Sequence, residues 1–109
     1  MSGAMDFSTL KWVKSELDET LKQARQALEA YVEEPADDSQ LRFCSAHLHQ
    51  VSGTLQMVEL YGASMLAEEM EKLLLDLQQD GIAQKDEALE LLMRGILQLP
   101  DYLDRLIAG

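Results

Sequence analysis

The sequence predicts an all-α fold: an antiparallel up-and-down four-helix bundle with either a kinked or an extra C-terminal helix. Of its 109 residues, 47% are hydrophobic and 6% aromatic, and only two are proline and six glycine. A β-sandwich would need more glycine and proline for its many turns. Apolar residues recur at alternating spacings of three and four along four long segments, as in amphipathic helices. The connections between these segments are short, so consecutive helices are expected to run in opposite directions.

The length of the chain predicts a single domain. Its opening, Met1-Ser2-Gly3-Ala4-Met5, has two methionines around small residues. We expect residues 1–5 to be a cloning remnant or a disordered start. Residues 6–109 form the predicted helical bundle domain. Their apolar pattern still continues at the last residues, so we expect a fragment of a longer chain.

The first helix is predicted to start between Asp6 and Ser8, either of which can cap it. It is predicted to end at Glu33-Glu34, because the residue before Pro35 is disfavoured in the α conformation. The residues expected to form its apolar stripe are Leu10, Trp12, Val13, Leu17, Leu21, Ala24, Leu28, Tyr31 and Val32.

The second helix, predicted over Leu41–Gly62 with Asp38 or Ser39 as its cap, is the central one. Its apolar seam consists of Leu41, Cys44, Leu48, Val51, Leu55 and Val58. Gly53 lies in the middle of this helix, where glycine costs roughly 1 kcal/mol relative to alanine. Since Gly53 follows His49 by one turn, we expect something to approach this histidine closely.

The third helix is predicted over residues 63–79, where Asp80-Gly81 ends it, and the fourth over residues 86–99. Pro100 then either kinks the fourth helix or opens an extra one. The inward-facing residues expected in the third helix are Met65, Leu66, Met70, Leu73, Leu74 and Leu77. Those expected in the fourth are Ala88, Leu91, Leu92, Ile96 and Leu97.

Charge and composition exclude several classes of partner. The formal net charge of −11 repels nucleic acid and anionic membrane surfaces, so neither is expected to bind, whereas a basic protein surface is a plausible partner. No apolar run approaches the roughly 20 residues that span a bilayer. The one cysteine, Cys44, allows no internal disulfide, and we expect a buried free thiol in a reducing, cytoplasmic compartment.

Few residues are suited to chemistry. The chain has no glycine-rich phosphate loop and no pair of cysteines. His47 and His49 are two apart and point to different faces of a helix, so we expect neither a metal site nor a cofactor. His47 is expected to be structural or solvated. The small or polar residues expected on the same face as His49 are Arg42, Ser45, Ser52, Gly53 and Gln56.

The run His49-Gln50-Val51-Ser52-Gly53 resembles the H-x-L-K-G core of histidine phosphotransfer (HPt) domains. This resemblance implies that His49 is a phosphoryl acceptor. It also implies a role for Glu71, which stands where CheA-type chemotaxis kinases have a glutamate that hydrogen-bonds the imidazole. Such a partner keeps the imidazole neutral and in one tautomer, as attack on a phosphoryl group requires.

Longer runs are similar to a narrower family, the N-terminal domain of ChpA/PilL-type hybrid CheA kinases of type IV pilus chemosensory systems. The most specific run is R-F-C-S-A-H-L-H-Q-V-S-G-T-L-Q-M-V-E-L-Y-G-A-S-M-L-A-E-E-M-E, over residues 42–71. The same module resembles the N-terminal part of the pilus scaffold protein FimL. The resemblance implies a parent chain that is a histidine kinase of twitching-motility signalling, while this isolated domain has no ATP site of its own.

Three residues depart from the phosphotransfer pattern. Ser52 replaces the usual lysine, Glu59 replaces the usual second glycine, and Glu68 stands where chemotaxis kinases have histidine. These changes remove a positive charge and add negative charge near His49. Arg42, two turns before His49, would either supply part of the missing positive charge or be an ordinary surface arginine.

Three functions therefore remain open. The first, which these departures favour, is a protein-docking module for CheY-like receiver domains or pilus scaffold proteins. The second is a working phosphorelay domain that takes a phosphoryl group on His49 from the kinase core of its parent protein. The third is a structural dimerisation bundle, which would be favoured if an oligomer buried the His49 face.

Overall fold

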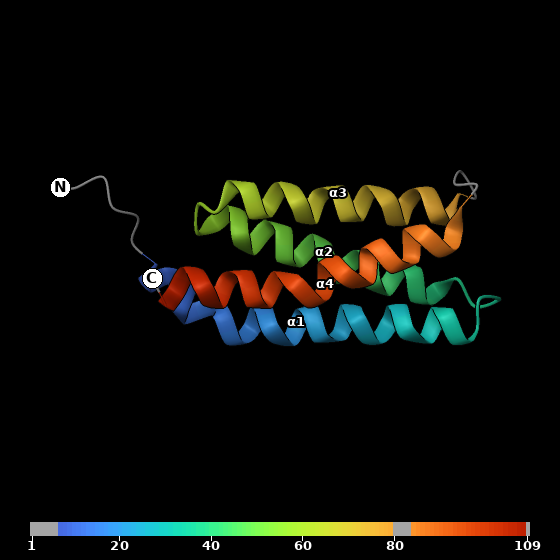
Figure 1. The fold of residues 1–109 in the computed structure, drawn as a ribbon, viewed down its shortest axis with the longest axis horizontal. Coiled ribbons are helices and arrows are strands. Elements are labelled where there is room, and N and C mark those ends of the chain that lie inside the picture. The colour runs from blue at the N-terminus through green and yellow to red at the C-terminus, as the bar shows by residue number, and fades with distance from the viewer. Residues whose placement is uncertain (1–6, 80–83, 109) are drawn as a thin grey trace.

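The structure is a computed structural model that describes residues 7–79 and 84–108. These residues form four helices, α1 (Ser8–Glu33), α2 (Ser39–Met57), α3 (Tyr61–Gln78) and α4 (Lys85–Ala108), and no strand. The helices lie side by side in an elongated bundle of 52 × 22 × 18 Å, and consecutive helices run in opposite directions (Figure 1). The predicted antiparallel four-helix bundle is confirmed.

The core is made by the apolar stripes of all four helices. Fully buried leucines dominate it, and burying each one stabilises the fold by roughly 1.5–3 kcal/mol relative to leaving it in water. The predicted seam of α2 is buried from Leu41 to Leu55, and Val58 is half-buried. The largest of its fully buried side chains are Leu10, Leu17, Leu21, Leu28, Leu41, Leu48, Leu55, Leu74, Leu92, Ile96, Leu99 and Leu103.

The second helix ends earlier than predicted, at Met57 and not at Gly62. Glu59 adopts the left-handed conformation, with a φ of 65°, that usually calls for glycine at this position. Its N–H donates to the carbonyl of Gln56 at 3.0 Å, and the N–H of Leu60 donates to that of Leu55 at 2.9 Å. This pair of bonds is a Schellman motif, so the helix stops although the residue at the turn is a glutamate.

The first helix begins at Ser8, within the predicted range, but the predicted cap of α2 needs correction. Asp38 makes no capping hydrogen bond with its side chain, and neither does Phe7, which precedes α1. Asp37 takes this role for α2, because its carboxylate accepts from both the amide, at 3.1 Å, and the hydroxyl of Ser39. These hydrogen bonds hold the pKa of the Asp37 carboxyl below its ordinary value. Asp6 lies outside the described residues.

Pro100 lies inside one continuous α4, so the alternative of a separate extra helix is wrong. In Figure 1 the first half of α4 begins near the end of α3 and slopes away from it, and its second half runs along α1. Lys14 joins α4 to α1 there, with its Nζ 2.6 Å from the Asp18 carboxylate and 2.8 Å from that of Asp104. The Lys14 side chain is only 10% exposed, so its charge is compensated by two carboxylates.

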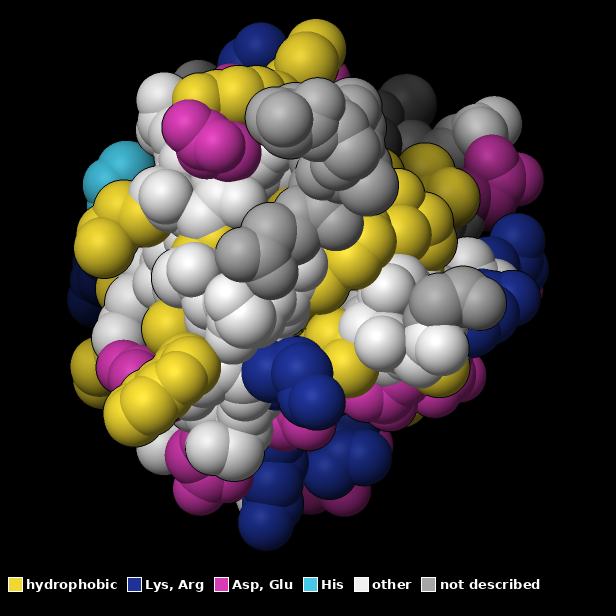
Figure 2. All heavy atoms as spheres, turned by 90° about the vertical axis from the view of Figure 1, so that its left-hand side faces the viewer, with side chains coloured by type: hydrophobic (Ala, Val, Ile, Leu, Met, Phe, Trp, Pro, Cys, Tyr) yellow, Lys and Arg dark blue, Asp and Glu magenta, His cyan; other side chains and the backbone are white. Residues whose placement is uncertain are grey.

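The bundle is less closely packed between α3 and α4, where a groove of about 810 Å³ opens. The groove explains why Leu66 of α3 and Leu91 of α4 line a surface instead of the core. Other residues predicted to face inward are exposed as well, namely Trp12, Val32, Met65 and Leu97. Figure 2 looks onto the end of the bundle where α1 begins and α4 ends, and hydrophobic side chains reach its surface among charged ones.

None of the helices in the described part of the chain combines the length and apolar character needed to cross a bilayer.

Candidate functional site

His49 and Glu71 form a pair across the interface of α2 and α3. Nδ1 of His49 lies 3.1 Å from Oε2 of Glu71. A carboxylate can only accept, so Nδ1 carries the proton and donates it, which leaves Nε2 with its lone pair. The imidazole is 81% exposed, whereas the Glu71 side chain is 22% exposed. The pair therefore presents an accessible, oriented nitrogen nucleophile.

A contact between two serines holds the helices together beside this pair. The Ser64 hydroxyl of α3 donates to the backbone carbonyl of Ser52 on α2 at 3.0 Å, and the two hydroxyl oxygens lie 3.3 Å apart. Both residues are buried. Small side chains let the helices approach closely, and the hydrogen bonds satisfy the buried hydroxyls. This contact fixes α3, and with it Glu71, relative to His49.

A hollow of about 500 Å³ lies beside the imidazole. It is lined by Ser45, His49, Ser52, Gly53, Gln56, Glu68, Glu71, Lys72 and Leu75. Glu68 and Glu71 bring two carboxylates to it, and Lys72 brings an ammonium group. A hollow with charged side chains at its lining, next to an exposed imidazole, can receive a small anionic group, provided that the carboxylates are compensated.

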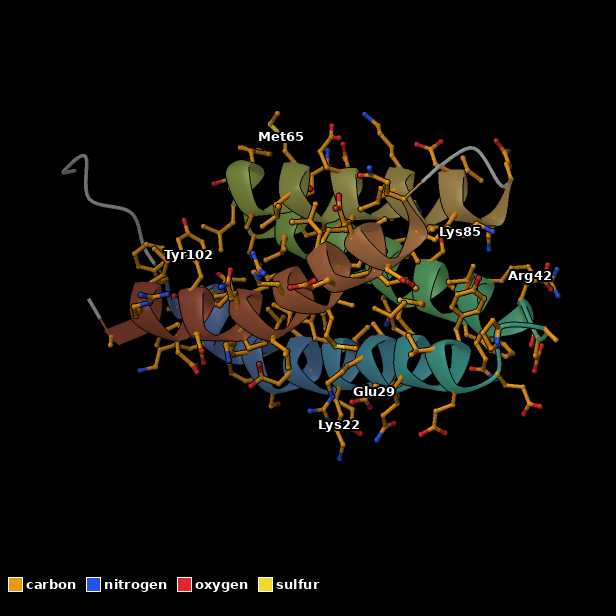
Figure 3. The ribbon with its side chains drawn as sticks, turned by 45° about the vertical axis from the view of Figure 1, so that its right-hand side comes forward. Lys22, Glu29, Arg42, Met65, Lys85 and Tyr102 are labelled. Carbon is orange, nitrogen blue, oxygen red and sulfur yellow. The ribbon has the colours of Figure 1, made fainter. Side chains whose placement is uncertain are left out.

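Four of the predicted binding residues, Ser45, Ser52, Gly53 and Gln56, are brought together around His49. Ser52 is only 4% exposed, so it lies at the floor of the hollow and its hydroxyl is engaged by Ser64. Arg42 does not belong to this group. Figure 3 shows Arg42 at the end of α2 next to the α1–α2 turn, and its charge acts there on Asp37. Arg42 is not among the residues that line the hollow, which favours the alternative of an ordinary surface arginine.

Gly53 faces open space. A Cβ built on it would meet nothing within 4 Å, so close packing within the chain does not explain this glycine. Gly53 follows His49 by four residues and shares its exposed helix face. The helix surface one turn after His49 thus carries no side chain at Gly53 and has open space above it.

Two residues of this hollow, Lys72 and Leu75, were missed by the sequence analysis. A signal was available, because Glu68, Glu71, Lys72 and Leu75 follow the spacing i, i+3, i+4, i+7 that brings residues to one helix face. The Lys72 side chain is 69% exposed, and its Nζ lies 3.3 Å from Oε1 of Glu69. It places a mobile positive charge next to the two carboxylates.

Other reactive side chains lie apart from this hollow. Burial raises the pKa of the Cys44 thiol to about 12, so the thiol is not a nucleophile at neutral pH. His47 is half-buried and does not line the hollow. The described residues contain no group of three or more histidine, cysteine, aspartate or glutamate side chains that could hold a metal ion.

Comparison with known proteins gives two matches. The family model described as Hpt domain matches residues 8–109. The chain is 34% identical over 102 residues to a protein of Pseudomonas aeruginosa named Scaffold protein FimL. This match covers 94% of the chain but 18% of FimL, so the chain spans less than a fifth of the length of this relative. No solved structure matches the chain.

Proposed function

The chain belongs to the Hpt domain family, and on this premise we propose that it carries a phosphoryl group on His49 between a kinase and the receiver domain of a response regulator. The observation that carries the proposal is the 3.1 Å contact between Nδ1 of His49 and Glu71, on an imidazole that is 81% exposed. A histidine that only stabilised the fold would need neither this exposure nor an oriented second nitrogen.

The transfer follows from this geometry. Nε2 of His49 attacks the γ-phosphorus of ATP held by a separate kinase domain, an N–P bond forms, and the bond to the β,γ-bridging oxygen breaks to release ADP. The imidazole becomes positively charged while Nδ1 keeps its proton, and the Glu71 carboxylate stabilises that charge as it develops. A receiver aspartate then attacks the phosphorus and regenerates the neutral imidazole.

The sequence alone favours docking without phosphate, because Ser52 replaces a lysine and Glu68 adds negative charge. Two features of the geometry support the phosphoryl carrier instead. Glu71 is positioned as a hydrogen-bond partner of the imidazole, and Lys72 compensates part of the acidic charge in the hollow. A hydrogen bond to a charged group contributes about 1.5–3 kcal/mol, and solvent screening lowers this contribution for an imidazole that is 81% exposed.

Docking without phosphate transfer is the second candidate. It is supported by the 34% identity to a protein that is named as a scaffold and by the burial of Ser52, whose hydroxyl cannot replace the missing lysine. In that case the face formed by His49, Gly53 and Gln56 binds a receiver or scaffold protein as a surface only. Replacing the imidazole would then leave binding intact.

We further propose that the parent chain is a cytoplasmic CheA-type kinase of a type IV pilus chemosensory system, in which this domain meets the kinase core, CheY-like receivers and pilus scaffold proteins. The resemblance of residues 42–71 to ChpA/PilL-type kinases supports this context, as does the identity to FimL. Isolation of the parent protein with its bound partners from cells tests it, and the absence of chemosensory or pilus components among them would contradict it.

The experiment that tests the phosphoryl carrier supplies the purified domain with the kinase core of its own parent protein and labelled ATP. We expect label that is stable in base and labile in acid, as for a phosphohistidine. His49→Gln should abolish it. His47→Gln, which changes the neighbouring histidine outside the hollow, is the matched control and should retain it.

Glu71→Gln tests the orienting role. The amide can still accept from Nδ1 but loses the charge that stabilises the imidazolium, so we expect incorporation about tenfold slower. An unlabelled wild-type domain, next to an ordinary H-x-L-K-G domain that labels under the same conditions, would refute the carrier and leave docking as the function. Equal labelling of wild type and Glu71→Gln would refute the role of the pair.

A further inference from the structure

Lys72 lies where a phosphoryl group on His49 needs a positive charge. A phosphoryl group carries close to two negative charges at neutral pH, and the hollow that receives it already contains the carboxylates of Glu68 and Glu71. Among the described residues that line the hollow, Lys72 is the one with a permanent positive charge. Without it, the added group would face uncompensated like charges on a chain of net charge −11.

Position 52, where the family motif has its lysine, cannot supply this positive charge. Ser52 is 4% exposed and pairs with Ser64, so this position is used to pack α2 against α3. A lysine there would have to displace that contact or leave its ammonium group in the interface. The positive charge must therefore come from another element, and α3 supplies it.

The ion pair of Lys72 with Glu69 does not prevent Lys72 from binding a phosphoryl group on His49. Its ion pair with Glu69 joins two side chains that are each 69% exposed, over 3.3 Å. Exposed pairs of this kind contribute little to stability, so the long side chain can turn toward a new anion at small cost. The ammonium group has three donors, which suit the three oxygens of a phosphoryl group.

We propose that Lys72 is the phosphoryl-binding residue of this domain, and that its ammonium group stabilises the phosphoryl group on His49 in place of a lysine three residues after the histidine. This inference rests on the proposed function, since it needs His49 to be a phosphoryl acceptor. In this proposal, two residues of α3 have separate roles. Lys72 compensates the negative charge of the phosphoryl group, and Glu71 orients the imidazole of His49.

The test uses phosphoramidate, a small phosphoryl donor that makes the reaction independent of any kinase contact. Nε2 of His49 attacks its phosphorus, the N–P bond of the donor breaks, and ammonia leaves. Phosphohistidine is followed by ³¹P NMR, for both its rate of formation and its lifetime. The variants are Lys72→Ala, Lys72→Arg and Lys22→Ala, of which the last removes the same charge from the outer face of α1 (Figure 3).

We expect Lys72→Ala to lower the formation rate or the lifetime by about three- to tenfold at low salt, and this difference to shrink at 1 M salt. Lys72→Arg should restore most of the loss, and Lys22→Ala should behave as wild type. Glu69→Gln, which releases Lys72 from its ion pair, should not lower the rate. Thermal unfolding should be the same for all four variants, since each changes an exposed side chain.

Two results would overturn the inference, and they can be told apart. If wild type is phosphorylated and Lys72→Ala equals Lys22→Ala at low salt, the role of Lys72 is wrong while the phosphoryl carrier stands. If wild type takes no phosphate from phosphoramidate or from its kinase while a control H-x-L-K-G domain does, the proposed function fails and this inference fails with it.

Discussion

At Gly53, a substitution is expected to raise the stability of the domain while it blocks the proposed function. It lies in the middle of α2, where glycine lowers helix stability, and a Cβ built on it meets nothing within 4 Å. The fold therefore gains nothing from glycine here. We predict that Gly53→Ala and Gly53→Arg both stabilise the domain, and that Gly53→Arg abolishes phosphoryl exchange with the receiver.

The magnitude follows from helix propensity alone, because no steric term opposes it. Replacing a mid-helix glycine by alanine gains about 0.5–1 kcal/mol, and arginine is close to alanine in propensity. For a domain of this size that free energy corresponds to a rise in Tm of about 2–8 °C. The arginine side chain would extend over the surface next to His49 and exclude a partner that approaches the imidazole.

Thermal unfolding followed by circular dichroism measures the first effect, and transfer of phosphate from the prephosphorylated domain to its receiver measures the second. Gly62→Arg is the matched control, since Gly62 lies in the first turn of α3, outside the His49 hollow, and its Cβ would also meet nothing within 4 Å. A lower Tm for Gly53→Ala would refute the argument that this surface is open. Unchanged transfer in Gly53→Arg would refute the argument that a partner docks there.

Three further predictions concern the fold. Glu59→Gly should stabilise the domain by about 1 kcal/mol, because glycine adopts the φ of 65° without strain; denaturant unfolding that shows a loss would contradict this. Lys14→Met should cost about 1–2 kcal/mol, since the carboxylates of Asp18 and Asp104 lose their shared partner at the α1–α4 contact. Burial lowers the pKa of Lys14, but the hydrogen bonds and charges of Asp104 and Asp18 outweigh it and raise the pKa above 10.5. The stabilisation should thus be complete below pH 10.5 and disappear as the pH rises through the raised value, a slope that Lys14→Met should lack. Cys44, with its pKa raised to about 12, should react with a thiol reagent at least about 100-fold more slowly in the folded domain than in denaturant; equal rates would show that α2 opens readily.

Much of the bundle could be predicted because its helices are long and strongly periodic. The seam of α2 and most of the stripe of α1 were located correctly, since one apolar face on each helix meets the same core, but Trp12 and Val32 of the α1 stripe are exposed. The exposure of Leu66 and Leu91 could not be predicted, because periodicity identifies the apolar side of a helix but not how much of that side another helix covers. In this bundle α3 and α4 leave a groove, so part of each stripe stays in contact with solvent. The end of α2 was missed for a different reason, since Glu59 adopts a conformation that its residue type disfavours.

In the candidate site, the sequence pattern likewise could not predict which of two neighbouring residues packs against another helix. The pairing of His49 with Glu71 could be predicted from the resemblance, but the roles of Ser52 and Gly53 could not. A glycine in mid-helix usually indicates close helix packing, yet here Ser52 makes the close contact with α3 and Gly53 meets empty space. Ser52 and Gly53 lie about 100° apart around α2, so the rotation of the helix about its own axis decides which of them meets α3, and the pattern along one helix does not define that rotation to within one residue. Since packing does not require Gly53, the glycine is best explained by a partner that must reach His49.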